Sequence, residues 1–254
     1  MKVNFLGTGT SQGVPVIGCE CPVCKSLDFR DKRFRTSIHV EAEGVSLVVD
    51  TGPDFRMQML RSGIRRLDAI LFTHEHKDHT GGLDDIRPFN FSQQKDMPIF
   101  GSKNVLKQIR REYAYVFSPK KYPGVPQIEQ IEIDENPFCV NGLAVTPIPV
   151  LHYKLPVFGF RFGNFSYITD AKQIPERSMK LLEGTEILVL NALQIDPHIS
   201  HFTLNEAIEM AKKIGAQQTY FTHISHRLGL HDSISKQIPD GVALAYDGLE
   251  LTLA

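Results

Sequence analysis

Apolar and polar positions alternate with the period of a β-strand in several parts of the chain. Residues 37–41 and 45–49 each show this alternation, and Glu43 and Gly44 lie between them, which predicts a hairpin. Residues 242–253 predict two further short strands. Residues 67–73 are mostly apolar without alternation, as expected for a buried strand.

Other stretches repeat their apolar residues with the period of an α-helix. Residues 53–64 place three apolar side chains on one helical face: Met57, Leu60 and Ile64. Residues 105–116 predict a second helix. Thr203 and Glu206 form a capping-box pattern that begins a third helix, which Gly215 ends. Because apolar helix faces need a sheet to cover them, we expect an α/β fold.

The composition fits one domain in the cytoplasm. The 254 residues are enough for one substantial core, and we expect a single domain spanning residues 1–254. A net charge of −1 gives no general attraction to nucleic acid or to an anionic membrane. No apolar run approaches the roughly 20 residues that span a bilayer. The first strand breaks at Gly7, so it does not form the apolar region of a signal peptide, and we expect a cytoplasmic protein.

The densest chemical signal is the motif H-x-H-x-D-H, formed by His74, His76, Asp78 and His79. It follows residues 67–73, so these side chains should lie on a loop at a strand end. One catalytic metal usually takes three protein ligands and keeps a position open for water. Three imidazoles and a carboxylate exceed that number, and two neighbouring metals would use all of them. A cluster of surface histidines would explain neither the carboxylate nor the apolar strand.

Further ligand-type side chains end other strand-like apolar runs. His152, Asp170 and His223 each come directly after such a run. One such residue alone would be better explained as a polar cap. Three with the same placement, together with the motif, favour a shared two-metal site. Two cations roughly 3.5–4 Å apart can activate water and stabilise both the entering and the leaving oxygen.

A second cluster lies near the N-terminus, where Cys19, Cys21 and Cys24 form C-x-C-x2-C. Disulfides need Cβ atoms roughly 3.5–4.5 Å apart, which is hard to achieve between such close neighbours. Zinc is therefore favoured, and a closed tetrahedral site needs a fourth ligand that spacing alone does not identify. His226 is a candidate, because its odd separation from His223 would turn the two imidazoles to opposite faces of an extended segment.

With these motifs the chain resembles the metallo-β-lactamase superfamily of metal-dependent hydrolases. The resemblance runs from Asp50 to His223 and implies an αββα four-layer sandwich. Asp50 matches an early aspartate of the superfamily that orients a ligand rather than binding metal. The resemblance also implies an allocation of ligands: His74, His76 and His152 to one metal, Asp78, His79 and His223 to the other, with Asp170 as the bridge.

A narrower resemblance is to the phosphoribosyl cyclic phosphodiesterases of bacterial phosphonate breakdown. It rests on residues 7–15, 18–21 and 222–226, the last reading Thr-His-Ile-Ser-His. It implies that the cysteine cluster and His226 bind one structural zinc. It also implies that His201 is a further active-site histidine. His198 and His231 carry no motif and are expected at the surface.

The leading hypothesis is a phosphodiesterase with two catalytic divalent metals, zinc or manganese. It would hydrolyse a small cyclic phosphate or a nucleotide-like diester by in-line attack of a metal-bound hydroxide. Charge growing on the phosphoryl oxygens would be stabilised by the adjacent cations. His201 or Asp78 would protonate the departing oxygen. The sequence leaves open the exact substrate, the native metal and the oligomeric state, a homodimer included.

Four alternatives compete with this hypothesis. A ribonuclease of the tRNA 3′-end-processing type is the nearest, but the short stretch between His152 and Asp170 leaves little room for an RNA-binding arm. The near-zero net charge also argues against a large nucleic-acid partner. Thioester or lactam hydrolysis would use the same metals, whereas oxygen-reducing di-iron relatives usually carry glutamate in place of His76. A non-catalytic binding module should show gaps in its ligand set.

Overall fold

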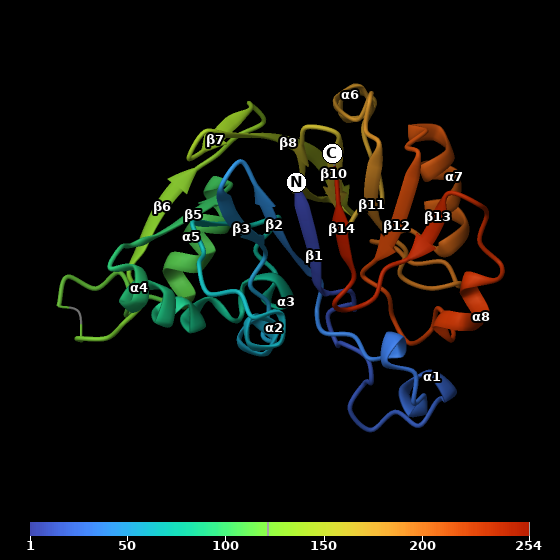
Figure 1. Ribbon diagram of the computed structural model, residues 1–254, viewed down its shortest axis with the longest axis horizontal. Coiled ribbons are helices and arrows are strands. Elements are labelled where there is room, and N and C mark those ends of the chain that lie inside the picture. The colour runs from blue at the N-terminus through green and yellow to red at the C-terminus, as the bar shows by residue number, and fades with distance from the viewer. Residues whose placement is uncertain (121, 254) are drawn as a thin grey trace.

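Two seven-stranded sheets dominate the computed structural model, which describes residues 1–120 and 122–253 (Figure 1). The first sheet has the order β14-β1-β2-β3-β4-β5-β6. Its strands are β1 (Lys2–Gly7), β2 (Ser37–Ala42), β3 (Val45–Val49), β4 (Ala69–Leu71), β5 (Met97–Gly101), β6 (Ile128–Glu132) and β14 (Glu250–Thr252). The second sheet has the order β13-β12-β11-β10-β9-β8-β7. Its strands are β7 (Phe138–Val140), β8 (Leu143–His152), β9 (Leu155–Phe162), β10 (Phe165–Ile168), β11 (Ile187–Asn191), β12 (Gln218–Thr222) and β13 (Val242–Leu244).

The strands predicted from alternation are present. β2 and β3 pair antiparallel with Ala42 opposite Val45, so the predicted hairpin is confirmed. Residues 242–253 contain the two predicted strands, but β13 joins the second sheet and β14 joins the first. β14 pairs antiparallel with β1, and the amino group of Met1 donates to the carbonyl oxygen of Leu253 at 3.0 Å. Residues 242–253 therefore contribute one strand to each sheet.

Successive residues of the interior strands face opposite layers. In β3, Leu47 and Val49 join the core between the two sheets, whereas Val48 joins the apolar layer under the helices of the first sheet. In β11, Val189 faces the other sheet and Leu188 faces the helices of the second sheet. This two-residue period on both sheets gives the order helix, sheet, sheet, helix. The predicted αββα sandwich is confirmed.

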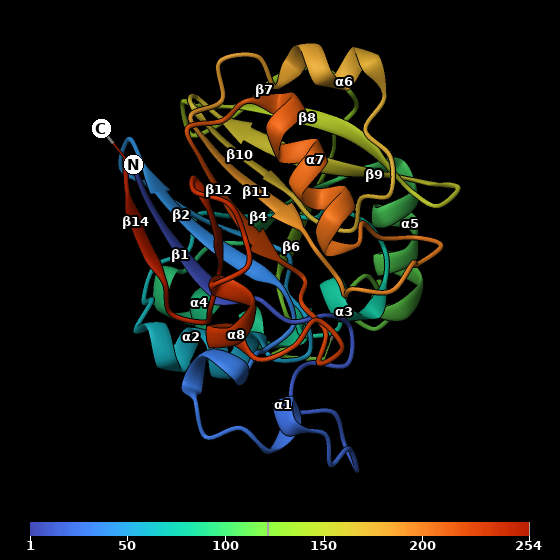
Figure 2. The same ribbon diagram turned by 90° about the vertical axis from the view of Figure 1, so that its right-hand side faces the viewer.

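Helices cover the outer faces of the sandwich (Figure 2). The first sheet is covered by α2 (Phe55–Ser62), α4 (Arg87–Gln93) and α5 (Lys103–Glu112), and the second by α6 (Glu176–Leu181), α7 (Leu204–Ile214) and α8 (His231–Ser235). The remaining helical segments are α1 (Pro22–Lys25), α3 (Lys77–Thr80), η1 (Phe29–Asp31) and η2 (Leu83–Ile86). The segment that carries α1 projects from the body of the molecule in both views. No helix in the two described ranges is long and apolar enough to cross a bilayer.

The ends of two predicted helices follow from local chemistry. α7 begins with the predicted capping box, in which Thr203 accepts from the Glu206 backbone N–H and the Glu206 side chain accepts from that of Thr203. It ends at Gly215, whose left-handed φ of 75° suits a residue without Cβ. α5 ends at Glu112, earlier than the predicted residue 116.

The first predicted helix is present as α2, but the prediction of its apolar face is wrong. Met57 is 48% exposed and Leu60 is 61% exposed. The helix instead buries Met59 together with Gln58, whose side-chain amide donates to the carbonyl oxygen of Arg35 at 2.8 Å. A hydrogen-bonded polar residue thus takes a core position, which a pattern of apolar residues alone does not reveal.

Six strands end at the same side of the molecule. β3 and β4 are parallel, as are β10, β11 and β12. β8 and β10 both run antiparallel to β9, so they share one direction. The side chains predicted as metal ligands follow or end β4, β8, β10 and β12. The fold therefore gathers them at one site.

Candidate metal centre

Three residues of the site leave their strands in the left-handed backbone conformation. Asp50 after β3 has φ 66°, Asp170 after β10 has φ 56° and His223 after β12 has φ 55°. This region is uncommon for residues other than glycine, and strained backbone conformations cluster at functional sites. The conformation turns the chain sharply at the strand end. We infer that local backbone strain helps to present these side chains at the edge of the sandwich.

His74, His76 and His152 form the first group of converging side chains. Their candidate ligand atoms all lie within 4.8 Å of one another. Thr73 donates its hydroxyl hydrogen to Asp50, so its oxygen accepts from Nδ1 of His74 at 2.9 Å. His152 donates from Nδ1 to the carbonyl oxygen of Ser200 at 3.0 Å. In both rings Nε2 is left without the hydrogen, which is the form that can bind a cation.

Asp78, His79, Asp170 and His223 form the second group, again with candidate ligand atoms within 4.8 Å of one another. Nε2 of His79 lies 3.2 Å from a carboxylate oxygen of Asp78 and 3.3 Å from one of Asp170. Nε2 of His223 lies 3.1 Å from the other oxygen of Asp170. Asp170 also groups with His152 of the first set, so its carboxylate lies between the two groups.

Asp50 lies behind this second group rather than in it. Its carboxylate accepts from Nδ1 of His79 at 2.7 Å and from the backbone N–H of Thr73 at 2.9 Å. The first contact turns Nε2 of His79 toward Asp78 and Asp170. A carboxylate in this position fixes the tautomer and the orientation of a metal-binding imidazole.

The second group contains buried nitrogens that lack a hydrogen-bond partner among the described residues. They are Nε2 of His79 and both ring nitrogens of His223, and neither side chain is more than 1% exposed. A buried polar atom without a partner costs roughly 1–3 kcal/mol. Here Nε2 of His79 and Nε2 of His223 face carboxylate oxygens at distances that suit ligands of a common cation. These residues therefore fit divalent metal ions.

The charges around Asp170 favour a cation. Burial raises its pKa, but the imidazoles of His223 and His79 outweigh burial and hold the pKa well below its ordinary value. Burial likewise lowers the pKa of His79, but the carboxylates of Asp78, Asp170 and Asp50 outweigh it and raise the pKa well above its ordinary value. The pocket thus holds ionised carboxylates that attract positive charge, whether a proton or a metal supplies it.

His201 lies at the edge of the centre, as expected for a further active-site residue. Its Nε2 is 3.0 Å from an oxygen of Asp170, and its ring stacks on that of His223 at a centroid distance of 4.8 Å. Burial lowers its pKa to about 4 despite the hydrogen bond to Asp170. It lines a cavity of about 230 Å³ together with His198 and Arg227. His201 therefore lies between this cavity and Asp170.

Of the two histidines expected at the surface, one is buried. His198 is partly exposed and lies beside His201, with their Nδ1 atoms 3.2 Å apart. His231 is only 5% exposed, because its Nδ1 accepts from the buried guanidinium of Arg33 at 3.1 Å. Neither histidine belongs to a sequence motif, so these two contacts could not be predicted from the sequence.

Two glycines also shape the site without having been singled out from the sequence. A Cβ on Gly52 would lie 2.2 Å from the carbonyl oxygen of Asp78, and one on Gly82 would lie 2.2 Å from that of Gly52. The backbone after β3 therefore packs directly on the loop that carries Asp78 and His79. The Asp-Thr-Gly sequence at residues 50–52 was the available signal for this contact.

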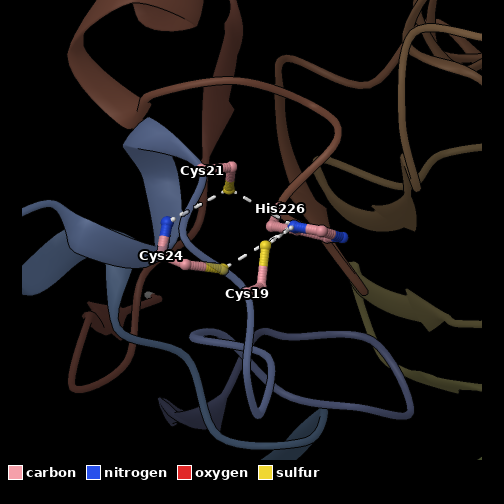
Figure 3. Close-up of side chains that lie close together, drawn as sticks. All are labelled: Cys19, Cys21, Cys24 and His226. Carbon is pink, nitrogen blue, oxygen red and sulfur yellow. Dashed lines mark hydrogen bonds between the residues drawn. The ribbon is translucent and has the colours of Figure 1, made fainter.

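The cysteine cluster and His226 come together as the sequence predicted (Figure 3). The sulfurs of Cys19, Cys21 and Cys24 lie 3.3, 3.4 and 3.6 Å from Nδ1 of His226. With Zn–S near 2.3 Å and Zn–N near 2.0–2.1 Å, ligands on one tetrahedral zinc lie about 3.6 Å apart. A hydrogen bond from the backbone N–H of Cys24 lowers the pKa of Cys21 to about 6, whereas burial raises the pKa of Cys24 to about 11, so zinc binding would release the Cys24 proton. The four residues therefore fit a closed zinc site.

Comparisons with known proteins agree with this fold. A family model described as "Beta-lactamase superfamily domain" matches residues 46–224. A solved structure described as a new diphosphatase from the PhnP family superposes with a TM-score of 0.93 at 40% identity, covering 100% of this chain and 98% of that one. The match therefore extends over the whole of both chains.

Two curated relatives are longer than this chain. An octanoyltransferase of Porphyromonas gingivalis is 39% identical over 253 residues, which is 98% of this chain but 51% of that protein. A ribonuclease Z of Bradyrhizobium diazoefficiens is 32% identical over 179 residues, which is 65% of this chain and 59% of that protein. The chain thus spans about half the length of these relatives.

Two findings assign the family. The family model matches most of the chain, and a solved structure is similar over its full length at 40% identity. The chain belongs to the beta-lactamase superfamily, within its PhnP family, and carries the fold and the residue groups of a metal-dependent hydrolase.

Proposed function

We propose that this chain is a two-metal phosphodiesterase that hydrolyses a small cyclic phosphate or a nucleotide-like diester. One observation carries the proposal. Buried imidazole nitrogens without hydrogen-bond partners among the described residues converge with two carboxylates at the ends of strands from both sheets. The similarity to a diphosphatase of the PhnP family supports phosphorus as the reacting centre.

We assign the metals to the two groups of side chains. His74, His76 and His152 would hold one cation, and Asp78, His79 and His223 the other, with Asp170 bridging them. A carboxylate suits the bridge because it has two oxygens to share. The two oxygens of Asp170 already contact different imidazoles, His79 through one and His223 and His201 through the other. Zinc and manganese both fit this set of nitrogen and oxygen donors.

When bound, two divalent cations make water a nucleophile at neutral pH and stabilise negative charge on phosphoryl oxygens. Residues of the chain orient the imidazoles and supply a proton. Asp50 keeps Nε2 of His79 turned into the site, and Thr73 does the same for His74. His201 faces the centre from the side of the open cavity, so it would donate a proton to the departing oxygen, with Asp78 as the alternative donor.

The surroundings of the site favour a small substrate. The adjoining cavity is about 230 Å³, which suits a substrate with few atoms beyond the scissile group. β9 and β10 fill the stretch between His152 and Asp170, and both pair within the second sheet. An arm that grips a large RNA has no place there. Together with a net charge of −1, this ranks an RNA substrate below a small diester, although a ribonuclease Z is among the relatives.

Because one relative is an octanoyltransferase, an acyl thioester is the most important alternative substrate to test. This chain matches only 51% of that protein, so its name assigns no activity to the matching part. The same metals would also permit attack on a thioester or a lactam carbonyl. A direct comparison of substrates is therefore needed.

A substrate panel tests the proposal. Protein reconstituted with zinc or manganese is offered bis(p-nitrophenyl) phosphate, a ribose cyclic phosphate, nitrocefin and an acyl thioester. We expect kcat/KM for at least one diester to exceed that for nitrocefin and for the thioester by more than about tenfold, that is about 1.4 kcal/mol of barrier. Faster turnover of the lactam or the thioester would show that the proposed substrate class is wrong.

We further propose that Cys19, Cys21, Cys24 and His226 bind one structural zinc. A closed site with four protein ligands leaves no position for water, so this metal would take no part in the chemistry. Its sulfur-to-nitrogen distances support the assignment. Because the ligands come from residues 19–24 and from residue 226, the zinc would join distant parts of the chain.

A further inference from the structure

The loop between β11 and α7 places a second histidine behind His201. On this loop, His198, Ser200 and His201 form a small cluster of polar atoms. Nδ1 of His198 lies 3.2 Å from Nδ1 of His201, and the hydroxyl oxygen of Ser200 lies 3.3 and 3.0 Å from these two nitrogens. The centroids of the two imidazole rings are 5.0 Å apart. His198 thus contacts His201 at its Nδ1 atom, whereas Nε2 of His201 faces Asp170.

The direction of one hydrogen bond orients His198. The backbone N–H of Ser200 donates to Nδ1 of His198 at 3.3 Å, so this nitrogen is an acceptor. The same nitrogen lies 3.2 Å from Nδ1 of His201. A ring that gives a proton from Nε2 starts as an imidazolium with a hydrogen on each nitrogen, so Nδ1–H of His201 can then donate to His198, either directly or through the hydroxyl of Ser200. At the opposite end of the ring, Nε2 of His201 contacts Asp170 at 3.0 Å.

The contact between His198 and His201 matters most when metals are bound. Cations at the two groups would engage the oxygens of Asp170, which would weaken the contact between Asp170 and Nε2 of His201. The contact with His198 would remain, since His198 lies outside the metal groups and lines the cavity. A proton donor must keep its orientation relative to the departing oxygen, because small misplacement costs much of the rate.

We propose that His198 is a positioning residue, which holds the ring of His201 so that Nε2 faces the scissile group during phosphodiester hydrolysis. This inference rests on the proposed function, in which His201 gives a proton to the leaving oxygen. It assigns to His198 a role through His201 and no contact with the reacting atoms.

The test compares leaving groups that do and do not need a proton. An alkoxide, as released from a ribose cyclic phosphate, needs protonation, whereas p-nitrophenolate leaves as a stable anion. His198→Leu removes the acceptor but keeps a side chain of similar size. We expect it to lower kcat for the ribose cyclic phosphate by about 10–100-fold, the range for residues that orient a functional group. Its kcat for bis(p-nitrophenyl) phosphate should fall much less, and His201→Ala should show the same contrast.

Two further variants separate positioning from general damage to the loop. In His198→Asn an amide oxygen can replace the Nδ1 acceptor, so this variant should recover most of the lost kcat. Ile199→Ala changes a neighbouring side chain that is 65% exposed, and it should leave both substrates unaffected. An equal fall for both substrates in His198→Leu, or no fall for either, would overturn the proposal.

A crystal structure of His198→Leu, with and without metal, gives a measurement that does not depend on turnover. The His201 ring should rotate or lose order relative to the wild-type ring. A ring that keeps its wild-type position in both crystals would also overturn the proposal. If the wild-type protein hydrolyses no diester, the proposed function fails, and the ring position in these crystals still decides whether His198 holds His201.

Discussion

At the scale of single residues, the hydrogen bond on one ring nitrogen decides what the other nitrogen can do. His79 donates to Asp50, His74 to Thr73 and His152 to the carbonyl oxygen of Ser200. Each contact leaves Nε2 pointing into the site. The geometry that we assign to metal binding is therefore built by residues that bind no metal.

Asp170→Asn should abolish the proposed two-metal site while the protein stays folded. Asparagine tolerates the left-handed φ of 56° at this position, whereas alanine would add backbone strain to the loss of charge. We expect a fall in kcat for diesters of at least about 100-fold, beyond the 10–100-fold typical of residues that only support a ligand. Turnover assays with a metal count and circular dichroism check this, and wild-type turnover with unchanged metal content would refute the bridging role.

Asp50→Asn should weaken metal binding without removing a ligand. The amide cannot match the carboxylate that accepts from His79 at 2.7 Å, so the imidazole loses its fixed orientation. The expected loss in metal affinity is about 10–100-fold. Competition with a fluorescent chelator measures it. Equal affinities in variant and wild type would mean that Asp50 serves the fold alone.

The sequence predicted most of the convergent residues because they share a simple placement, directly at strand ends. It did not predict His198 as a neighbour of His201, since the contact depends on how the loop folds back after β11. It also missed the burial of His231, which depends on Arg33, a residue far away in sequence. Placement along a strand is local information, whereas these contacts are tertiary.

At the scale of elements, the segment before the cysteines and the segment after β12 meet at one cavity. Ser11, Gln12 and His226 line the same cavity as His201. Spacing predicted the three cysteines as a group and the resemblance implied His226 as the fourth ligand, but the position of His226 beside the cavity was not predicted. We therefore expect changes in the cysteine segment to affect both stability and substrate binding.

Cys21→Ser should remove one zinc per chain and lower the melting temperature. Loss of zinc binding energy is loss of folding energy, and each 1 kcal/mol shifts Tm by roughly 2–4 °C in a protein of this size. We expect a fall of more than about 5 °C and a raised KM, because the cavity wall loosens. Calorimetry and metal analysis provide the readout.

The matched control for that variant is Cys139→Ser, since Cys139 is an exposed cysteine outside the cluster. It should keep the full zinc content and the wild-type melting curve. If Cys21→Ser also keeps the full zinc content and the wild-type melting curve, the proposal of a structural zinc is wrong.

His231, at the first position of α8, should make stability depend on acid pH. Burial, followed by the charge of Arg33, lowers its pKa in the folded protein to about 4 from an ordinary value of 6.5. Between these values the unfolded chain binds a proton that the folded chain does not, so stability falls as pH drops from 6.5 to 4 and levels off below. His231→Asn, which keeps an acceptor for Arg33, should lose less stability over this window.

Urea unfolding of both proteins from pH 4 to pH 8 measures the difference. The difference between their unfolding free energies should change with pH, and its slope should correspond to no more than one bound proton per chain. The change should be steepest between pH 4 and 6.5. Parallel curves through that window would contradict the buried neutral state of His231.

Element prediction succeeded where one face of a strand or helix carried a regular pattern and failed where a polar group was buried. The hairpin β2–β3 and the capped helix α7 were predicted with nearly correct ends. α2 was predicted with the wrong face because Gln58 is buried through a hydrogen bond to Arg35. Apolar periodicity does not detect a core position held by an amide.

At the scale of the whole molecule, the proposed metal centre joins the two sheets. Asp50 and the 74–79 loop follow strands of the first sheet, whereas His152, Asp170 and His223 end or follow strands of the second. The sandwich and the αββα order were predictable from resemblance and periodicity. The distances between side chains of different sheets were not, because they depend on how the sheets pack through the core between them.

The most direct test of the central claim is a metal titration of the metal-free protein, with hydrolysis of bis(p-nitrophenyl) phosphate followed at each step. Zinc should first fill the closed cysteine site without producing activity. Activity should then rise and reach a plateau when two further equivalents per chain are bound, and Asp170→Asn should show no such rise. Full activity with only one equivalent beyond the cysteine site, or no diester hydrolysis with all sites filled, would contradict the two-metal phosphodiesterase.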